Sequence, residues 1–208
     1  MRACARRATI GEAAARPVVA DRPMIDVVLT LIGTDRPGLV ESVAAIIAAY
    51  QGNWVESRMT QLAGKFAGIL RAELPPQKVD DAVRALRGLE SRGIRVVVET
   101  APRQASVAQD SSRKMVLDLM GLDRPGIVHE ISQLLSSCGV NVEELTTNRS
   151  SAPMSGDMLF QARAHVALPA STNLAHLRAA LERVGNDLMV DVKLESPVEA
   201  QANKTAET

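Results

Sequence analysis

The chain has 208 residues with 24 basic and 24 acidic side chains, so its formal net charge is zero, and only 2% of its residues are aromatic. Duplex binding depends on a basic surface and single-strand binding on aromatic stacking platforms, so direct nucleic-acid binding is disfavoured. The two cysteines imply no disulfide framework, which predicts a cytoplasmic protein, and no apolar run is long enough to predict a membrane-spanning helix.

Residues 1–23 differ in composition from the rest of the chain, because arginines and alanines dominate and only two acids occur. The segment lacks the apolar core of a secretory signal. We predict a disordered extension, or an over-extended start that places the functional beginning at Met24. An organellar transit peptide is the alternative that the composition leaves open.

The first predicted domain spans residues 24–100. An apolar run at 29–32 predicts a strand, and alternating apolar residues at 66–74 predict another with one buried face. Apolar residues at helical spacing predict a helix with one buried stripe between them. That stripe consists of Leu39, Val43, Ile46, Ile47 and Tyr50. A second helical pattern starts at Val79, and a short apolar strand follows at 94–98.

A second copy of this pattern follows a predicted linker at 101–112 and spans residues 113–196. The tetrapeptide Asp-Arg-Pro-Gly at 35–38 recurs at 123–126, an offset of 88 residues. From Phe66 and Phe160 onward the offset is 94, so the second copy carries six extra residues, which we place in a polar loop at 149–156. We predict its closing strand at 188–192. Residues 197–208 are predicted to form a disordered tail.

Each copy therefore predicts the order strand, helix, strand, strand, helix, strand, which is the ferredoxin-like split βαβ unit. The predicted fold class is α+β, with two tandem ferredoxin-like domains. Each domain would hold one antiparallel sheet with its two helices on one face. The other face then needs a cover or must tolerate water.

The Asp-Arg-Pro-Gly turn supports two compatible interpretations. In the structural one, proline occupies the first helical turn, the aspartates Asp35 and Asp123 cap free amides, and glycines relieve the backbone. In the binding one, the same helix N-terminus receives a carboxylate and the aspartate an ammonium group, which together describe a free amino acid. Asn53 and Asn141, each at the start of the next strand, would add amide contacts.

The pattern Gly-x-Asp-Arg-Pro-Gly-[Leu/Ile]-Val in this order of elements resembles the ACT domain, a small regulatory module that binds amino acids between paired copies. The tandem layout over residues 24–196, with its insertion at 151–160, resembles the glycine cleavage system transcriptional repressor family. The resemblance implies ligand-binding residues in both copies. They are Gly33, Asp35, Arg36, Pro37, Gly38 and Asn53, and Gly121, Asp123, Arg124, Pro125, Gly126 and Asn141.

The resemblance also implies a non-enzymatic, amino-acid-responsive regulator of glycine cleavage that acts through a protein partner such as a transcription activator. Glycine and serine are the candidate ligands. We expect no metal or cofactor, because the three histidines lack equivalents in the other copy and no metal spacing, catalytic triad or phosphate loop occurs. A regulatory subunit that controls a metabolic enzyme in trans and a structural dimerisation unit with empty turns are the alternatives. A homodimer is compatible with all of them.

Overall fold

The computed structural model describes residues 24–100, 112–152, 156–198 and 200, and the chain divides into two compact units, Met1–Ser106 and Val107–Thr208. The predicted N-terminal extension, the predicted linker up to residue 111, and the predicted tail at 199 and from 201 onward lie outside the described residues. Within that tail, Pro197, Val198 and Ala200 are helical, and the Ala200 N–H donates to the Ser196 carbonyl at 3.0 Å.

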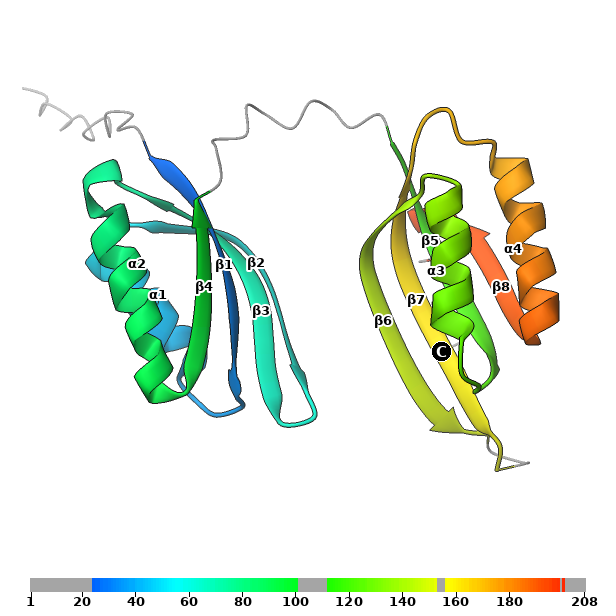
Figure 1. The fold of residues 1–208 in the computed structure, drawn as a ribbon, viewed down its shortest axis with the longest axis horizontal. Coiled ribbons are helices and arrows are strands. Elements are labelled where there is room, and N and C mark those ends of the chain that lie inside the picture. Colours follow the sequence, from blue (N-terminus) through cyan, green and yellow to red (C-terminus); the bar gives the residue numbers. More distant parts are fainter. Residues whose placement is uncertain (1–23, 101–111, 153–155, 199, 201–208) are drawn as a thin grey trace, which may run out of the picture. The chain divides into compact units, whose positions relative to one another are not determined.

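Each unit contains four strands and two principal helices in the predicted order (Figure 1). The elements of the first unit are β1 (Ile25–Thr34), α1 (Leu39–Ala49), β2 (Asn53–Leu62), β3 (Lys65–Leu74), η1 (Pro76–Lys78), α2 (Val79–Gly88), η2 (Leu89–Arg92) and β4 (Ile94–Thr100). Those of the second unit are β5 (Arg113–Leu122), α3 (Ile127–Ser137), β6 (Asn141–Ser151), β7 (Met158–Leu168), α4 (Leu174–Leu188) and β8 (Val190–Glu195).

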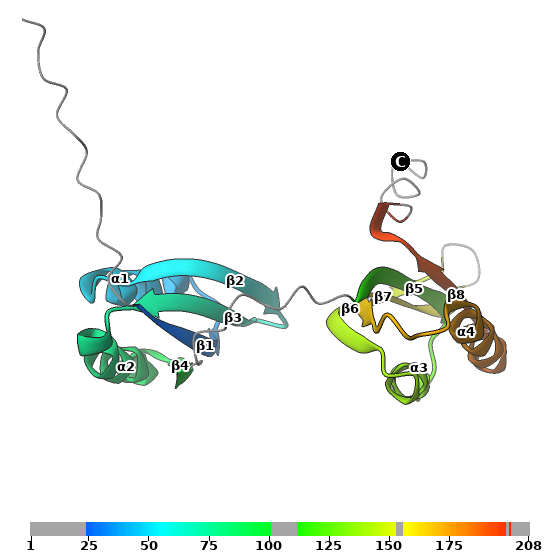
Figure 2. The ribbon, with the colours of Figure 1, turned by 90° about the horizontal axis from the view of Figure 1, so that it is seen from above.

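The two sheets have the same topology. Their strand orders are β2-β3-β1-β4 and β6-β7-β5-β8, and every pairing is antiparallel. Both helices of a unit lie on one face of its sheet, and we call the opposite side the open face (Figure 2). The predicted fold class, two tandem ferredoxin-like α+β domains with helices on one face, is therefore confirmed.

The core of each unit lies between the sheet and its helices. The predicted stripe of the first helix is confirmed, because Leu39, Val43 and Ile47 of α1 are buried, and Ile46 and Tyr50 pack partly buried against the same core. The corresponding helix α3 buries its own stripe. Burial of these apolar side chains is the main favourable contribution to folding of each unit.

Two predicted boundaries in the second copy were wrong. Residues Arg149–Ser151 are not loop, because they continue β6 and pair with β7 in a lengthened hairpin. Backbone pairing decides there, since an edge strand exposed on both faces needs no apolar alternation. The closing strand begins at Val190 rather than at 188, because Leu188 is the buried last residue of α4. Met189 then ends the helix with a left-handed φ of 53°.

Helices that could cross a membrane are not found in the described ranges. None of the helices described there is both long and apolar enough to cross a bilayer. The helices instead divide into a buried face and a polar face, as expected of helices that cover one side of a sheet.

The burial pattern of β3 predicts a sharp difference between two neighbouring side chains. Leu70 is 0% exposed, whereas Ile69 is 50% exposed on the open face. We expect Leu70→Ala to lower the free energy of unfolding by about 2–5 kcal/mol through loss of burial and a residual cavity. Ile69→Ala should change it by less than about 1 kcal/mol. Urea unfolding followed by the fluorescence of Trp54, the only tryptophan, measures both; equal losses would contradict the assigned faces.

Candidate functional site

The Asp-Arg-Pro-Gly turn connects β1 to α1 in the first unit and β5 to α3 in the second. Gly38 and Gly126 are the N-cap residues, with left-handed φ values of 89° and 101°. Their carbonyls accept the first helical hydrogen bonds, from the N–H groups of Ser42 and Glu130 at 3.0 Å each. Among the described residues, no side chain caps either helix. The first backbone amides of α1 and α3 are therefore available to an external acceptor.

The structural roles predicted for aspartate and proline at this turn were wrong. The N-cap position belongs to the glycine, so the aspartate lies three residues before it, and Pro37 precedes the helix instead of occupying its first turn. The backbone amides of Asp35 and Asp123 donate to the Gly64 and Met158 carbonyls at 2.9 and 2.8 Å. These bonds attach each turn to the adjacent hairpin.

The two aspartate side chains have different surroundings. The Asp123 carboxylate forms an ion pair with Arg149 of β6, with 2.7 Å between Oδ2 and Nε. The Asp35 carboxylate is exposed, and the residues that the structure describes give it neither a hydrogen bond nor an ion pair. Of the two, only Asp35 therefore offers an unoccupied carboxylate next to the helix start.

The arginines of the two turns bind backbone within their own units. Arg36 Nη2 donates to the Arg92 carbonyl at 2.7 Å, and Arg124 Nη2 donates to the Leu188 carbonyl. Arg92 is the last residue of η2 and Leu188 is the last residue of α4, where the last carbonyls have no donor within the helix. The guanidinium groups thus connect the turn to the end of η2 in the first unit and to the end of α4 in the second.

The glycines of the signature serve two purposes. A Cβ on Gly121 would lie 2.6 Å from the Met189 carbonyl oxygen, and one on Gly33 would lie 3.0 Å from the Gly93 oxygen. These glycines permit close approach of the neighbouring strand. A Cβ on Gly38 would meet nothing within 4 Å, so its glycine is explained by its left-handed φ and leaves open space beside the amides.

The asparagines begin their strands as predicted, but they lie far from the turn of their own unit. Asn53 pairs with Glu73, which pairs with Asp26, seven residues before Gly33 along β1. At about 3.3 Å per residue this separation is about 23 Å. Asn141 is equally far from Gly121, because it lies opposite Ala167, which lies opposite Lys114, seven residues before Gly121. Counting antiparallel register along the predicted strands could have revealed this separation.

A shallow hollow of about 310 Å³ lies beside the first turn, and sequence reasoning missed its charged side chains. It includes Gly33 and Thr34, and Lys65 Nζ donates to Thr34 Oγ1 at 3.1 Å. Arg95 also lines it, 4.0 Å from Glu90. Lys65 and Arg95 come from strands distant in sequence, so only their pairing with the end of β1 identifies them.

The same positions in the second unit carry different residues. Leu159 takes the place of Lys65, because it lies opposite Leu122 as Lys65 lies opposite Thr34. Asp191 takes the place of Arg95, because it lies opposite Met120 as Arg95 lies opposite Ile32. At these two positions next to the turn, the first sheet therefore carries two cations, whereas the second carries a leucine and an aspartate. Nothing in the described ranges brings three or more His, Cys, Asp or Glu side chains together as a metal site.

Comparisons with known proteins agree with the architecture. The sequence model described as ACT domain matches residues 26–99 and 113–195. Two UPF0237 proteins, from Methanosarcina mazei and Methanosarcina acetivorans, are each 36% identical over 53 residues, or 26% of this chain. The chain spans only 58% of the length of these curated relatives.

Two solved structures are similar over most of the chain. A protein described as unknown from Galdieria sulphuraria is 29% identical with a TM-score of 0.73, covering 83% of this chain and 98% of that one. A putative glycine cleavage system transcriptional repressor is 17% identical with a TM-score of 0.61, covering 83% and 96%. The second likeness shows the shared fold.

The crowding at Gly121 leads to a stability prediction. Gly121→Ala places a methyl group against backbone atoms of Met189 and Val190, so we expect a loss of about 1–3 kcal/mol in the free energy of unfolding. Gly33→Ala has a longer closest contact and should lose less. Calorimetric melting of both variants tests the order. Unchanged stability of Gly121→Ala would contradict the close approach of β5 and β8.

Proposed function

The chain belongs to the ACT domain family, and from this premise we propose that it is a non-enzymatic, amino-acid-responsive regulator. We further propose that it is cytoplasmic and controls transcription of the glycine cleavage system through a protein partner. Support for this role comes from the tandem layout, which the putative repressor of that system shares as a fold. The observation that carries ligand binding is the uncapped start of α1 beside the unoccupied Asp35 carboxylate.

The first turn has the chemistry that a free amino acid requires. The amides at the start of α1 and the positive end of its dipole favour a carboxylate. Lys65 adds positive charge at the same end of the sheet, where Arg95 lies 4.0 Å from Glu90. Asp35 offers an acceptor for the ammonium group. The open space at Gly38 allows a ligand to approach the backbone.

The second turn is less suited to the same ligand. Its aspartate, Asp123, already binds Arg149, so an ammonium group would have to displace a charge-assisted contact. The hollow beside the first turn has no lysine or arginine counterpart at the paired positions of β7 and β8. On this proposal the first unit is the principal amino-acid site.

A ligand that contacts both a turn and an asparagine must contact two units, because about 23 Å separates these groups within one unit. An amino acid held in this way would favour the paired arrangement over the unpaired one. It would shift that equilibrium only by its difference in affinity for the two states.

Binding of glycine and serine should depend on Gly38. Gly38→Ala adds a methyl group beside the free amides, and we expect at least tenfold weaker binding to the first turn by isothermal titration calorimetry. Gly126→Ala is the matched control, because it imposes similar left-handed strain at the equivalent position of the second unit. Equal affinity of Gly38→Ala and the unmodified chain would contradict the site.

Arg149→Gln extends this test, since it gives the second turn the residue found at the equivalent Gln61. Releasing Asp123 should improve amino-acid binding at the second turn. One binding event more than in the unmodified chain is the expected result of the titration. Loss of binding at the first turn in this variant would show that the two turns were assigned wrongly.

The regulatory partner can be identified with the full chain as bait. Affinity capture from a cell extract, with and without glycine, should recover a transcription factor in an amount that changes with the ligand. The Gly38→Ala chain should no longer respond to glycine. Recovery of a metabolic enzyme instead would contradict the transcriptional role and support regulation of that enzyme in trans.

A further inference from the structure

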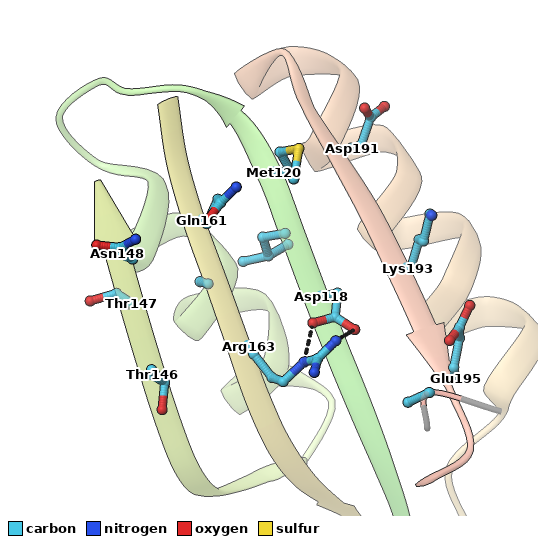
Figure 3. A pocket seen from close by; sticks show the side chains of 13 residues that line it. Asp118, Met120, Thr146, Thr147, Asn148, Gln161, Arg163, Asp191, Lys193 and Glu195 are labelled. Carbon is cyan, nitrogen blue, oxygen red and sulfur yellow. Dashed lines mark hydrogen bonds and ion pairs between the residues drawn. The ribbon is translucent and has the colours of Figure 1, made fainter. Parts of the chain in front are cut away.

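The open face of the second sheet carries a second polar site, distinct from the turns. A pocket of about 500 Å³ lies over this face and is lined by four strands and by Ala200 (Figure 3). Its volume is in the range usual for small-molecule sites. The polar and charged residues that line it are Asp118, Thr146, Thr147, Asn148, Gln161, Arg163, Asp191, Lys193 and Glu195.

An ordered charge pair lies at the centre of this pocket. Arg163 Nε and Nη2 donate to Asp118 Oδ1 and Oδ2 at 2.6 and 3.0 Å. This bidentate contact fixes the planes of both groups, as Figure 3 shows. On the other side of β5, Lys193 of β8 lies opposite Asp118 in the strand register. One carboxylate is therefore flanked by two cations in a single row across the sheet.

Two charged side chains that line this pocket have no partner within the described part of the chain. They are Lys193 and Asp191, which make no ion pair or hydrogen bond there. Both lie on the open face of β8 two residues apart, a separation of about 7 Å. A molecule with a carboxylate and an ammonium group can bind both at once. A simple anion would satisfy Lys193 and leave Asp191 unpaired.

The fold does not require this charged row. The equivalent positions of the first unit, related by the same strand pairings, are Thr30, Ile69 and Val97. That sheet forms with uncharged residues at these positions, and pairs as exposed as Asp118 and Arg163 contribute little to stability. The pocket and the two side chains of opposite charge that line it, Lys193 and Asp191, therefore point to a ligand.

We propose that this pocket binds a free amino acid with a polar side chain. Lys193 binds the carboxylate, with Arg163 as a neighbouring donor held in place by Asp118. Asp191 accepts from the ammonium group. Asn148 and Gln161, which pair across β6 and β7 in the adjoining row, hydrogen-bond the side chain. This site is separate from the turn of the first unit and does not depend on it.

The test uses the full chain carrying Gly38→Ala, so that binding at the first turn is suppressed. Calorimetry with serine and glutamine should still show one binding event, whereas acetate and ethylamine, which carry one charged group each, should bind at least tenfold more weakly. Adding Lys193→Gln or Asp191→Asn should reduce amino-acid affinity at least tenfold. Lys114→Gln is the matched control, because Lys114 lies on the same sheet outside the pocket and should leave affinity unchanged.

Each outcome separates this proposal from the proposed function. If Gly38→Ala alone abolishes all amino-acid binding, the pocket proposal is overturned and the turn site stands. If Lys193→Gln abolishes binding and Gly38→Ala has no effect, the pocket stands and the turn site fails. Acetate binding as tightly as serine would overturn the zwitterion assignment. Unchanged affinity in both Lys193→Gln and Asp191→Asn would overturn the pocket itself.

Discussion

The constraint on which the rest of the structure depends is that each four-stranded sheet has two faces, whereas the described residues supply two principal helices per unit to cover them. Both helices lie on the same side, so the core occupies one layer and the other face meets solvent (Figure 2). Residues in the core layer must remain apolar in both copies to bury enough surface. Residues on the open face carry no such requirement, which is why Ile69 and Arg163 can occupy equivalent positions.

The duplicated signature follows first from this architecture. Its strand glycines allow β1 to approach β4 and β5 to approach β8 closely, and its arginines bind the carbonyls of the last residues of η2 and α4. Its last glycine supplies the left-handed residue before each helix. Most of Asp-Arg-Pro-Gly is thus explained by folding. Ligand binding, on our proposal, uses what these contacts leave over: helix amides in both units and one unoccupied carboxylate in the first.

Periodicity predicted the fold well because core burial produces it. The α1 and α3 stripes repeat at helical spacing since one side of each helix meets the sheet. The β6 end was missed because an edge strand exposed on both faces carries no such pattern. The Asp118–Arg163 pair was missed for another reason. It joins residues 45 apart in sequence, and only the β5–β7 register makes them neighbours.

Divergence between the copies is the main support for our proposal that the two units bind different ligands. In the first unit the turn keeps an unoccupied aspartate with two cations nearby, while the centre of the open face carries the uncharged residues Thr30, Ile69 and Val97. In the second unit an ion pair occupies the turn aspartate, while the open face holds a charged pocket. Two equal sites for one ligand would have kept the same chemistry in both places. A chain with one site at a helix start and another on a sheet face can instead respond to two concentration ranges of one amino acid, or to two different amino acids, because the two sites have different affinities.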